Sequence, residues 1–92
     1  MKITEVRIRI PQNLPENVLA FASVCLDDEL VVHGLAVVQG ERGAFVSMPS
    51  KPPRAHGGER LDIVHPANRE FRKYLEEEVI SAYELKLQEE PV

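Results

Sequence analysis

The sequence lacks long hydrophobic runs, paired cysteines and a recognisable leader. Its longest apolar stretches are about nine residues, far short of the roughly 20 that a membrane-spanning helix needs. Cys25 is the single cysteine, so no internal disulfide can form. The start, MKITEVRIRI, mixes charged and apolar residues in a way that signal peptides do not. Together these absences predict a cytoplasmic protein.

The sequence also lacks the common signatures of catalysis and metal binding. It has no Ser/His/Asp arrangement, no P-loop and no dinucleotide-binding glycine motif, which predicts no enzyme activity and no cofactor. His33, His56 and His65 show none of the spacings typical of metal ligands, so we expect no metal site. A small-molecule or metal sensor that uses His33 and His65 stays open as an alternative.

Size and composition indicate one globular domain, which we place over residues 1–92. The hydrophobic fraction is 43%, normal for a folded protein. The formal net charge is −4, which argues against an obligate nucleic-acid binder. Residues 42–73, however, carry seven basic and three acidic side chains, for a net charge of +4. A local positive field of this kind attracts phosphate despite the acidic total.

Five segments have the composition or the alternation of β-strands: residues 2–10, 18–26, 29–38, 44–48 and 61–64. The second and third segments are joined by Asp27-Asp28, which predicts a β-hairpin with a short acidic turn. A turn explains these aspartates better than paired catalytic carboxylates do, because Asp tolerates turn dihedrals. Cys25 lies in an apolar run, so we expect an inert buried thiol.

The C-terminal region predicts one helix that begins at Pro66 or Asn68 and ends before Pro91. Apolar residues recur on one side of it at helical spacing: Phe71, Tyr74, Leu75, Val79, Ile80, Ala82 and Tyr83. On the outer side, the spacing of Arg72–Glu76 and Lys73–Glu77 predicts two ion pairs. Residues 88–92 are expected to form a frayed tail. The predicted class is therefore α+β: a small antiparallel sheet of four to five strands followed by one C-terminal helix.

Both faces of the two longest predicted strands are apolar, whereas one helix covers only one face of a sheet. Strict alternation over residues 29–38 places Val31, Leu35 and Val37 on one face and Leu30, Val32 and Val38 on the other. Soluble monomers rarely leave such a face exposed. We therefore expect a homodimer. The alternative is a sheet curled on itself, with loops over its second face.

Basic residues gather around the predicted start of the helix. Lys51, Arg54 and Arg60 lie in or beside residues 49–60, a segment rich in proline and glycine that we expect to be a mobile loop. Arg69, Arg72 and Lys73 lie in the first turns of the helix. A basic loop beside a helix N-terminus suits phosphate binding. A merely solvated charged surface remains the alternative.

Three further observations bear on this predicted binding surface. Arg7 and Arg9 share one face of the first strand and could extend the basic surface. No phenylalanine, tyrosine or tryptophan interleaves the basic residues of the loop over residues 49–60, so this loop gives little support for stacking on single-stranded bases. Only one helix is predicted, which argues against a helix-turn-helix.

Several phrases of the sequence, taken in order, resemble the SpoVG family. They are MKITEVRIR, FASVCLDDELVVHGLAVVQG, GAFVSMPSK, DIVHPANREFR and VISAYE, and they span Met1 to about Glu84. The resemblance implies a small α+β domain that forms a homodimer, binds DNA and RNA, and regulates sporulation, septation or other gene expression. It implies no cofactor and no catalytic residues.

The resemblance also bears on the binding residues. It implies that Lys51, Arg69, Arg72 and Lys73 contact nucleic acid, whereas Arg54 and Arg60 are predicted from charge alone. Pro52-Pro53 and Leu35-Ala36 stand where family members often carry basic residues. The sequence therefore also allows an alternative function, a protein–protein interaction module in cell division or envelope control that does not bind nucleic acid. The acidic residues 74–92 would form its partner surface.

Overall fold

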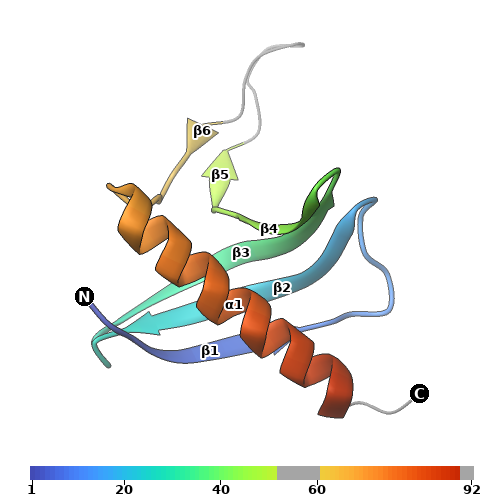
Figure 1. Cartoon of the computed structure of the whole chain (residues 1–92), viewed down its shortest axis with the longest axis horizontal. Coiled ribbons are helices and arrows are strands. Elements are labelled where there is room, and N and C mark those ends of the chain that lie inside the picture. Colours follow the sequence, from blue (N-terminus) through green and yellow to red (C-terminus); the bar gives the residue numbers. More distant parts are fainter. Residues whose placement is uncertain (52–60, 90–92) are drawn as a thin grey trace.

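The computed structural model describes residues 1–51 and 61–89. Its elements are, in chain order, β1 (Ile3–Arg9), β2 (Val18–Leu26), β3 (Leu30–Gly40), β4 (Gly43–Ser47), β5 (Ser50–Lys51), β6 (Leu61–Asp62) and α1 (Arg69–Glu89). Strands β1 to β4 form one antiparallel sheet in sequence order, and β5 pairs with β6 in a separate ribbon. Figure 1 shows α1 lying across one face of the larger sheet. The predicted α+β class, with an antiparallel sheet and a C-terminal helix, is confirmed.

Several element boundaries differ from the predicted ones, and the strand predicted over residues 61–64 ends already at Asp62. Residues 50–51 fall within the predicted loop, but they form β5, which pairs with β6. The rest of that predicted loop, residues 52–60, lies outside the described residues. The helix continues to Glu89, so residues 88 and 89 are helical rather than frayed, while residues 90–92 lie outside the described part. Strand β3 reaches Gly40, which shortens the turn before β4.

The acidic turn between β2 and β3 is structural. Asp27 and Asp28 have φ angles of 53° and 56°, left-handed values that aspartate accepts more readily than most residues. The Glu29 amide closes this three-residue turn by donating to the Leu26 carbonyl at 2.9 Å. The Asp27 carboxylate accepts a hydrogen bond from the Lys2 amide at 2.8 Å, and the Asp28 amide donates to the Thr4 hydroxyl at 3.1 Å. These aspartates therefore tie the N-terminus to the hairpin, and the predicted turn is confirmed.

The hydrophobic core lies between the sheet and α1. Its central helical residues are Leu75 and Val79, which are buried against side chains from all four strands of the larger sheet. Tyr74 adds a polar tie, because its hydroxyl accepts a hydrogen bond from the Ile3 amide at 3.0 Å. The face of the sheet that α1 packs against is called the covered face below. The opposite side is called the uncovered face.

A bulge in β3 corrects the predicted assignment of residues to these faces. Ala22 pairs with Leu35 and Val24 with Val32, so one residue of β2 lies opposite two residues of β3. Gly34, at φ 87°, is the residue that absorbs the insertion. Leu35 and Val37 are therefore fully buried on the covered face, whereas Val31 lies on the uncovered face and is 51% exposed. Strict alternation was wrong because it ignored this glycine.

The uncovered face is only partly apolar. Register and burial place seven hydrophobic residues on it: Val18, Phe21, Cys25, Val31, Ala36, Val38 and Phe45. The same face carries six polar ones: Glu5, Arg7, Arg9, Ser23, His33 and Ser47. Cys25 is partly exposed there, so the expected buried thiol was wrong. This face therefore differs from the uniformly apolar surface on which the predicted homodimer was based.

Candidate nucleic-acid interface

The start of α1 is fixed by its cap. The Asn68 side-chain oxygen accepts a hydrogen bond from the Phe71 amide at 2.8 Å, which is the contact of an N-cap residue. His65 lies just before it, with Nδ1 3.0 Å from the carbonyl oxygen of Pro66. Of the two predicted starting residues, Asn68 is the cap. It places Arg69 at the first helical position.

Three of the predicted binding residues share one end of the helix. Arg69, Arg72 and Lys73 follow at intervals of three and four residues, which places them on neighbouring positions of the helix surface. Arg69 and Lys73 are exposed, and Arg72 is half-buried. The first turn of a helix also presents backbone N–H groups without intrahelical partners. Cationic side chains and free donors thus occur together here.

The β5–β6 ribbon brings a fourth predicted residue toward this end. Arg72 lines a shallow hollow of about 380 Å³ together with Leu61 and Asp62 of β6 and with His65. Lys51 pairs with Leu61 across the ribbon and is exposed. The ribbon stands beside the beginning of α1 (Figure 1). The remaining two predicted residues, Arg54 and Arg60, lie outside the described residues.

The ion pairs predicted along the helix are not formed. Among the described residues, neither Arg72 with Glu76 nor Lys73 with Glu77 makes one, whereas Arg7 does pair with Glu5 on β1. Long side chains lose rotamer entropy when they pair at an exposed surface, so such pairs are weak. The charges of Arg72 and Lys73 are therefore not held by these carboxylates.

The described residues contain no group of three or more His, Cys, Asp or Glu side chains that could hold a metal ion. His33 instead lies 2.9 Å from the Ser23 hydroxyl through Nδ1, and His65 contacts the Pro66 carbonyl. The arrangement at the start of α1 can attract anions electrostatically and through hydrogen bonds.

Within the described ranges, no helix is both long and apolar enough to cross a bilayer.

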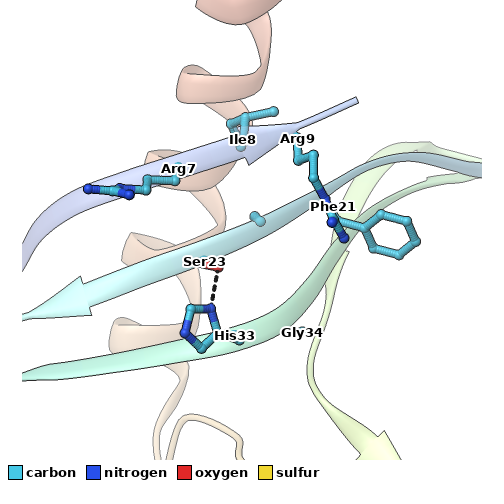
Figure 2. Close-up of a pocket in the computed structure, with 8 residues that line it drawn as sticks. Arg7, Ile8, Arg9, Phe21, Ser23, His33 and Gly34 are labelled. Carbon is cyan, nitrogen blue, oxygen red and sulfur yellow. Dashed lines mark hydrogen bonds between the residues drawn. The ribbon is translucent and has the colours of Figure 1, made fainter. Parts of the chain in front are cut away.

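A second group of basic residues lies on the uncovered face. Arg7 and Arg9 project from β1 beside a hollow of about 390 Å³ that Phe21, Ser23 and His33 also line (Figure 2). The Arg7 Nε atom donates a hydrogen bond to Glu5 at 2.8 Å. This bond and the charge of Glu5 raise the pKa of Arg7 above its ordinary value, so Arg7 stays protonated.

Sequence reasoning identified the two arginines of this hollow but missed its other residues. The pairs Arg9–Phe21 and Arg7–Ser23 follow from the register of the β1–β2 pairing, which the sequence alone does not set. The signal for His33 was Gly34, since an isolated glycine inside a strand suggests a bulge.

Comparison with known proteins gives the family. The SpoVG family model matches residues 1–85, nearly the whole chain. The chain belongs to the SpoVG family. Among similar relatives, septation protein SpoVG of Staphylococcus saprophyticus is 44% identical over 84 residues, which cover 91% of this chain and 80% of the relative. The Borrelia hermsii relative of the same name is 41% identical over 85 residues, covering 90% and 86%.

The likeness extends along nearly the full length of some relatives. Septation protein SpoVG of Lachnospira eligens is 42% identical over 84 residues, which cover 91% of this chain and 92% of the relative. The family match therefore includes the sheet, the ribbon and most of α1. Lys51, Arg69, Arg72 and Lys73 all lie within the matched residues.

Proposed function

We propose that this SpoVG-family chain is a nucleic-acid-binding regulatory protein that acts on DNA or RNA and affects sporulation, septation or gene expression. The observation that supports it best is the start of α1. Arg69, Arg72 and Lys73 follow directly after the Asn68 cap, and Arg72 meets the ribbon that carries Lys51. Arg54 and Arg60 lie outside the described residues, and their part in binding is proposed from their charge alone.

The proposed contacts are made mainly to phosphate. Cations in the first turn of a helix oppose its macrodipole, so their position is unfavourable for folding alone. The same position is favourable once an anion binds, because the positive end of the helix and the cationic side chains then act together. Phosphate contacts carry no base sequence. Weak sequence preference and a steep dependence on salt are therefore expected.

We also propose that the chain acts as a homodimer. The apolar residues at the β4 side of the uncovered face support this, since Phe45 is 44% exposed and lies opposite Val38. A two-fold axis would place two basic helix starts on one assembly. Two related patches contact more phosphates than one, which steepens the salt dependence. Measuring the mass of the free protein in solution tests the dimer directly.

The test of the binding surface is a titration of labelled duplex and labelled single strand at several salt concentrations. The double variant Lys51→Ala/Arg69→Ala is compared with Lys2→Ala/Arg42→Ala, a control that removes two exposed cations from elsewhere. The first double variant should weaken binding to all sequences alike and reduce the salt slope by about one per lost phosphate contact. A change in sequence preference alone would contradict the phosphate mechanism.

The alternative is an interaction module that binds protein partners through the acidic side of α1. Glu77 and Glu78 are exposed there, next to the half-buried Glu76. This function requires a pull-down that survives nuclease treatment and is lost on neutralising Glu76, Glu77 and Glu78 to glutamine. A well-folded protein that binds no nucleic acid at low salt would favour this alternative.

A further inference from the structure

We infer that the uncovered face of the sheet binds single-stranded nucleic acid, with backbone phosphates on Arg7 and Arg9 and a base stacked on the Arg9–Phe21 pair. This inference rests on the proposed function and adds to it a second contact surface and a preference for single strands. This surface is separate from the one at the start of α1, because α1 packs on the opposite side of the sheet (Figure 1).

The register of the sheet brings the required groups together. Arg7 lies opposite Ser23, and Arg9 lies opposite Phe21. The Arg9 guanidinium carbon lies 5.6 Å from the centre of the Phe21 ring, so a positive charge is held against an aromatic face. Arg7, Arg9 and Phe21 all line one hollow of about 390 Å³. Figure 2 shows Arg9 beside Phe21, with Arg7 farther along the same strand. A cation and an aromatic ring side by side suit a nucleotide, because the cation contacts its phosphate and the ring stacks on its base.

The bulge in β3 provides the floor of the hollow. Gly34 lines the hollow, and the insertion places His33 where its Nδ1 meets the Ser23 hydroxyl at 2.9 Å. His33 and Ser23 supply hydrogen-bonding groups at the base of the hollow, and Arg7 and Arg9 supply them at its rim. Sequence-specific and nonspecific recognition of single strands both use such groups around a stacking surface.

The charges on this face favour a phosphate ligand. Both arginines have exposed side chains, and that of Arg7 is 79% exposed. Glu5 is the carboxylate beside them, and it holds Arg7 through the 2.8 Å ion pair. A phosphate that binds Arg7 must therefore compete with Glu5. Removing the Glu5 carboxylate should therefore raise the affinity for single strands by more than removing an equal charge elsewhere does.

A single strand fits these groups better than a duplex does. In a duplex the bases are stacked on one another, so a ring on a broad strand surface cannot reach a base face. In a single strand the bases are available for stacking on aromatic side chains and on guanidinium planes. The β1 side is also a poor place for a second copy of this chain, because burying Arg7, Arg9 and Glu5 carries a desolvation cost.

The first experiment compares two variants with a charge-matched control. Strands of about 12 nucleotides, as oligo-dT, oligo-U and a mixed duplex, are titrated with each folded protein. Arg7→Gln/Arg9→Gln should lower the affinity for both single strands about tenfold or more, while duplex affinity stays within about twofold. Phe21→Leu keeps an apolar side chain and should lower single-strand affinity at least about fivefold. Lys2→Gln/Arg42→Gln is the control.

The second experiment uses the competing carboxylate. Glu5→Gln should raise single-strand affinity by about two- to fivefold, because Arg7 is released from its ion pair. Glu78→Gln makes the same change in net charge on exposed α1 and should raise it by less than half as much. A gain in affinity cannot come from misfolding. Equal gains from both variants would show a general charge effect and would overturn the role of Arg7.

The outcomes separate this inference from the proposed function. If Lys51→Ala/Arg69→Ala weakens binding while the Arg7, Arg9 and Phe21 variants do not, the proposed function stands and the sheet surface is wrong. The sheet surface is also wrong if a second copy buries Arg7 and Arg9. If the folded wild-type protein binds neither strand nor duplex at low salt, both proposals fail. Loss of single-strand binding alone in the sheet variants supports the inference.

Discussion

The covered and uncovered faces are built from alternate residues of the same strands, yet they differ in almost every property. Along β2, Ala20, Ala22 and Val24 are buried beneath α1, whereas Phe21 and Ser23 between them are partly exposed. The covered residues are small or branched and apolar, and they are selected by packing against one helix. The uncovered ones mix aromatic, hydroxyl and charged groups. The side chains of the covered face form the core that stabilises the fold. The uncovered face carries polar, charged and aromatic side chains that this core does not require.

The bulge at Gly34 keeps these two faces distinct. Without the extra residue, the side chains of β3 after position 34 would exchange faces, because the side-chain period of a strand is two. Leu35 and Val37 would then leave the core, and Ala36 and Val38 would enter it. Variants along β3 are therefore the sharpest way to test the comparison.

The largest effect is expected from Leu35→Ala. Leu35 is fully buried, and truncating a buried leucine costs about 2–5 kcal/mol of unfolding free energy through lost transfer energy and a residual cavity. Val31→Ala is the control on the same strand, since Val31 is half exposed on the uncovered face. It should cost less than about 1 kcal/mol. Urea unfolding of both variants measures the difference, and equal losses would contradict the assigned faces.

A smaller effect is expected from Gly34→Ala. A Cβ atom at this position would meet Pro49 at an ordinary distance of 3.6 Å, so space is not the problem. The φ angle of 87° is the problem, because it strains any residue with a Cβ, by about 1–2 kcal/mol. Gly34→Asn should cost less than Gly34→Ala, since asparagine tolerates positive φ better. Thermal unfolding compares the two. An equal or larger loss with asparagine would argue against strain.

The fold was largely predictable from the sequence, for reasons that individual residues make clear. Asp27-Asp28 set the hairpin, because few residues accept two successive positive φ angles. Asn68 and the stripe that includes Leu75 and Val79 set the helix. The faces of β3 were not predictable from periodicity, because one inserted residue reverses every later position. Gly34 was the visible warning.

The candidate site was predictable only in part. Residues that are close in sequence, such as Arg69, Arg72 and Lys73, were grouped correctly on one end of a helix. Arg9 and Phe21 are distant in sequence and meet only through the pairing register of β1 with β2. Residues 49–60 contain no phenylalanine, tyrosine or tryptophan, although Phe71 lies between Arg69 and Arg72 on the helix. Neither observation bore on the sheet, where cation and ring come from different strands.

Tyr74→Phe tests the polar tie between the covered face and the helix. The variant removes the hydroxyl that accepts a hydrogen bond from the part-buried Ile3 amide, and it leaves the ring in place. Loss of such a bond costs about 1 kcal/mol. Tyr83→Phe removes the hydroxyl of a half-buried tyrosine elsewhere on α1 and serves as the control. Chemical denaturation should rank Tyr74→Phe as the more destabilising of the two, and the reverse order would contradict the importance of this bond.

The smallest effect is expected at Cys25, on the uncovered face. Because the thiol is partly exposed, Cys25→Ser should change the unfolding free energy by less than about 0.5 kcal/mol. The thiol should also react with a small reagent without unfolding. Comparing the labelling rates of wild type and Leu35→Ala decides this point: if labelling required global unfolding, the destabilised variant would react about 30-fold faster or more. Equal rates would place the thiol at an open surface, and a large acceleration would show that the face is closed in solution.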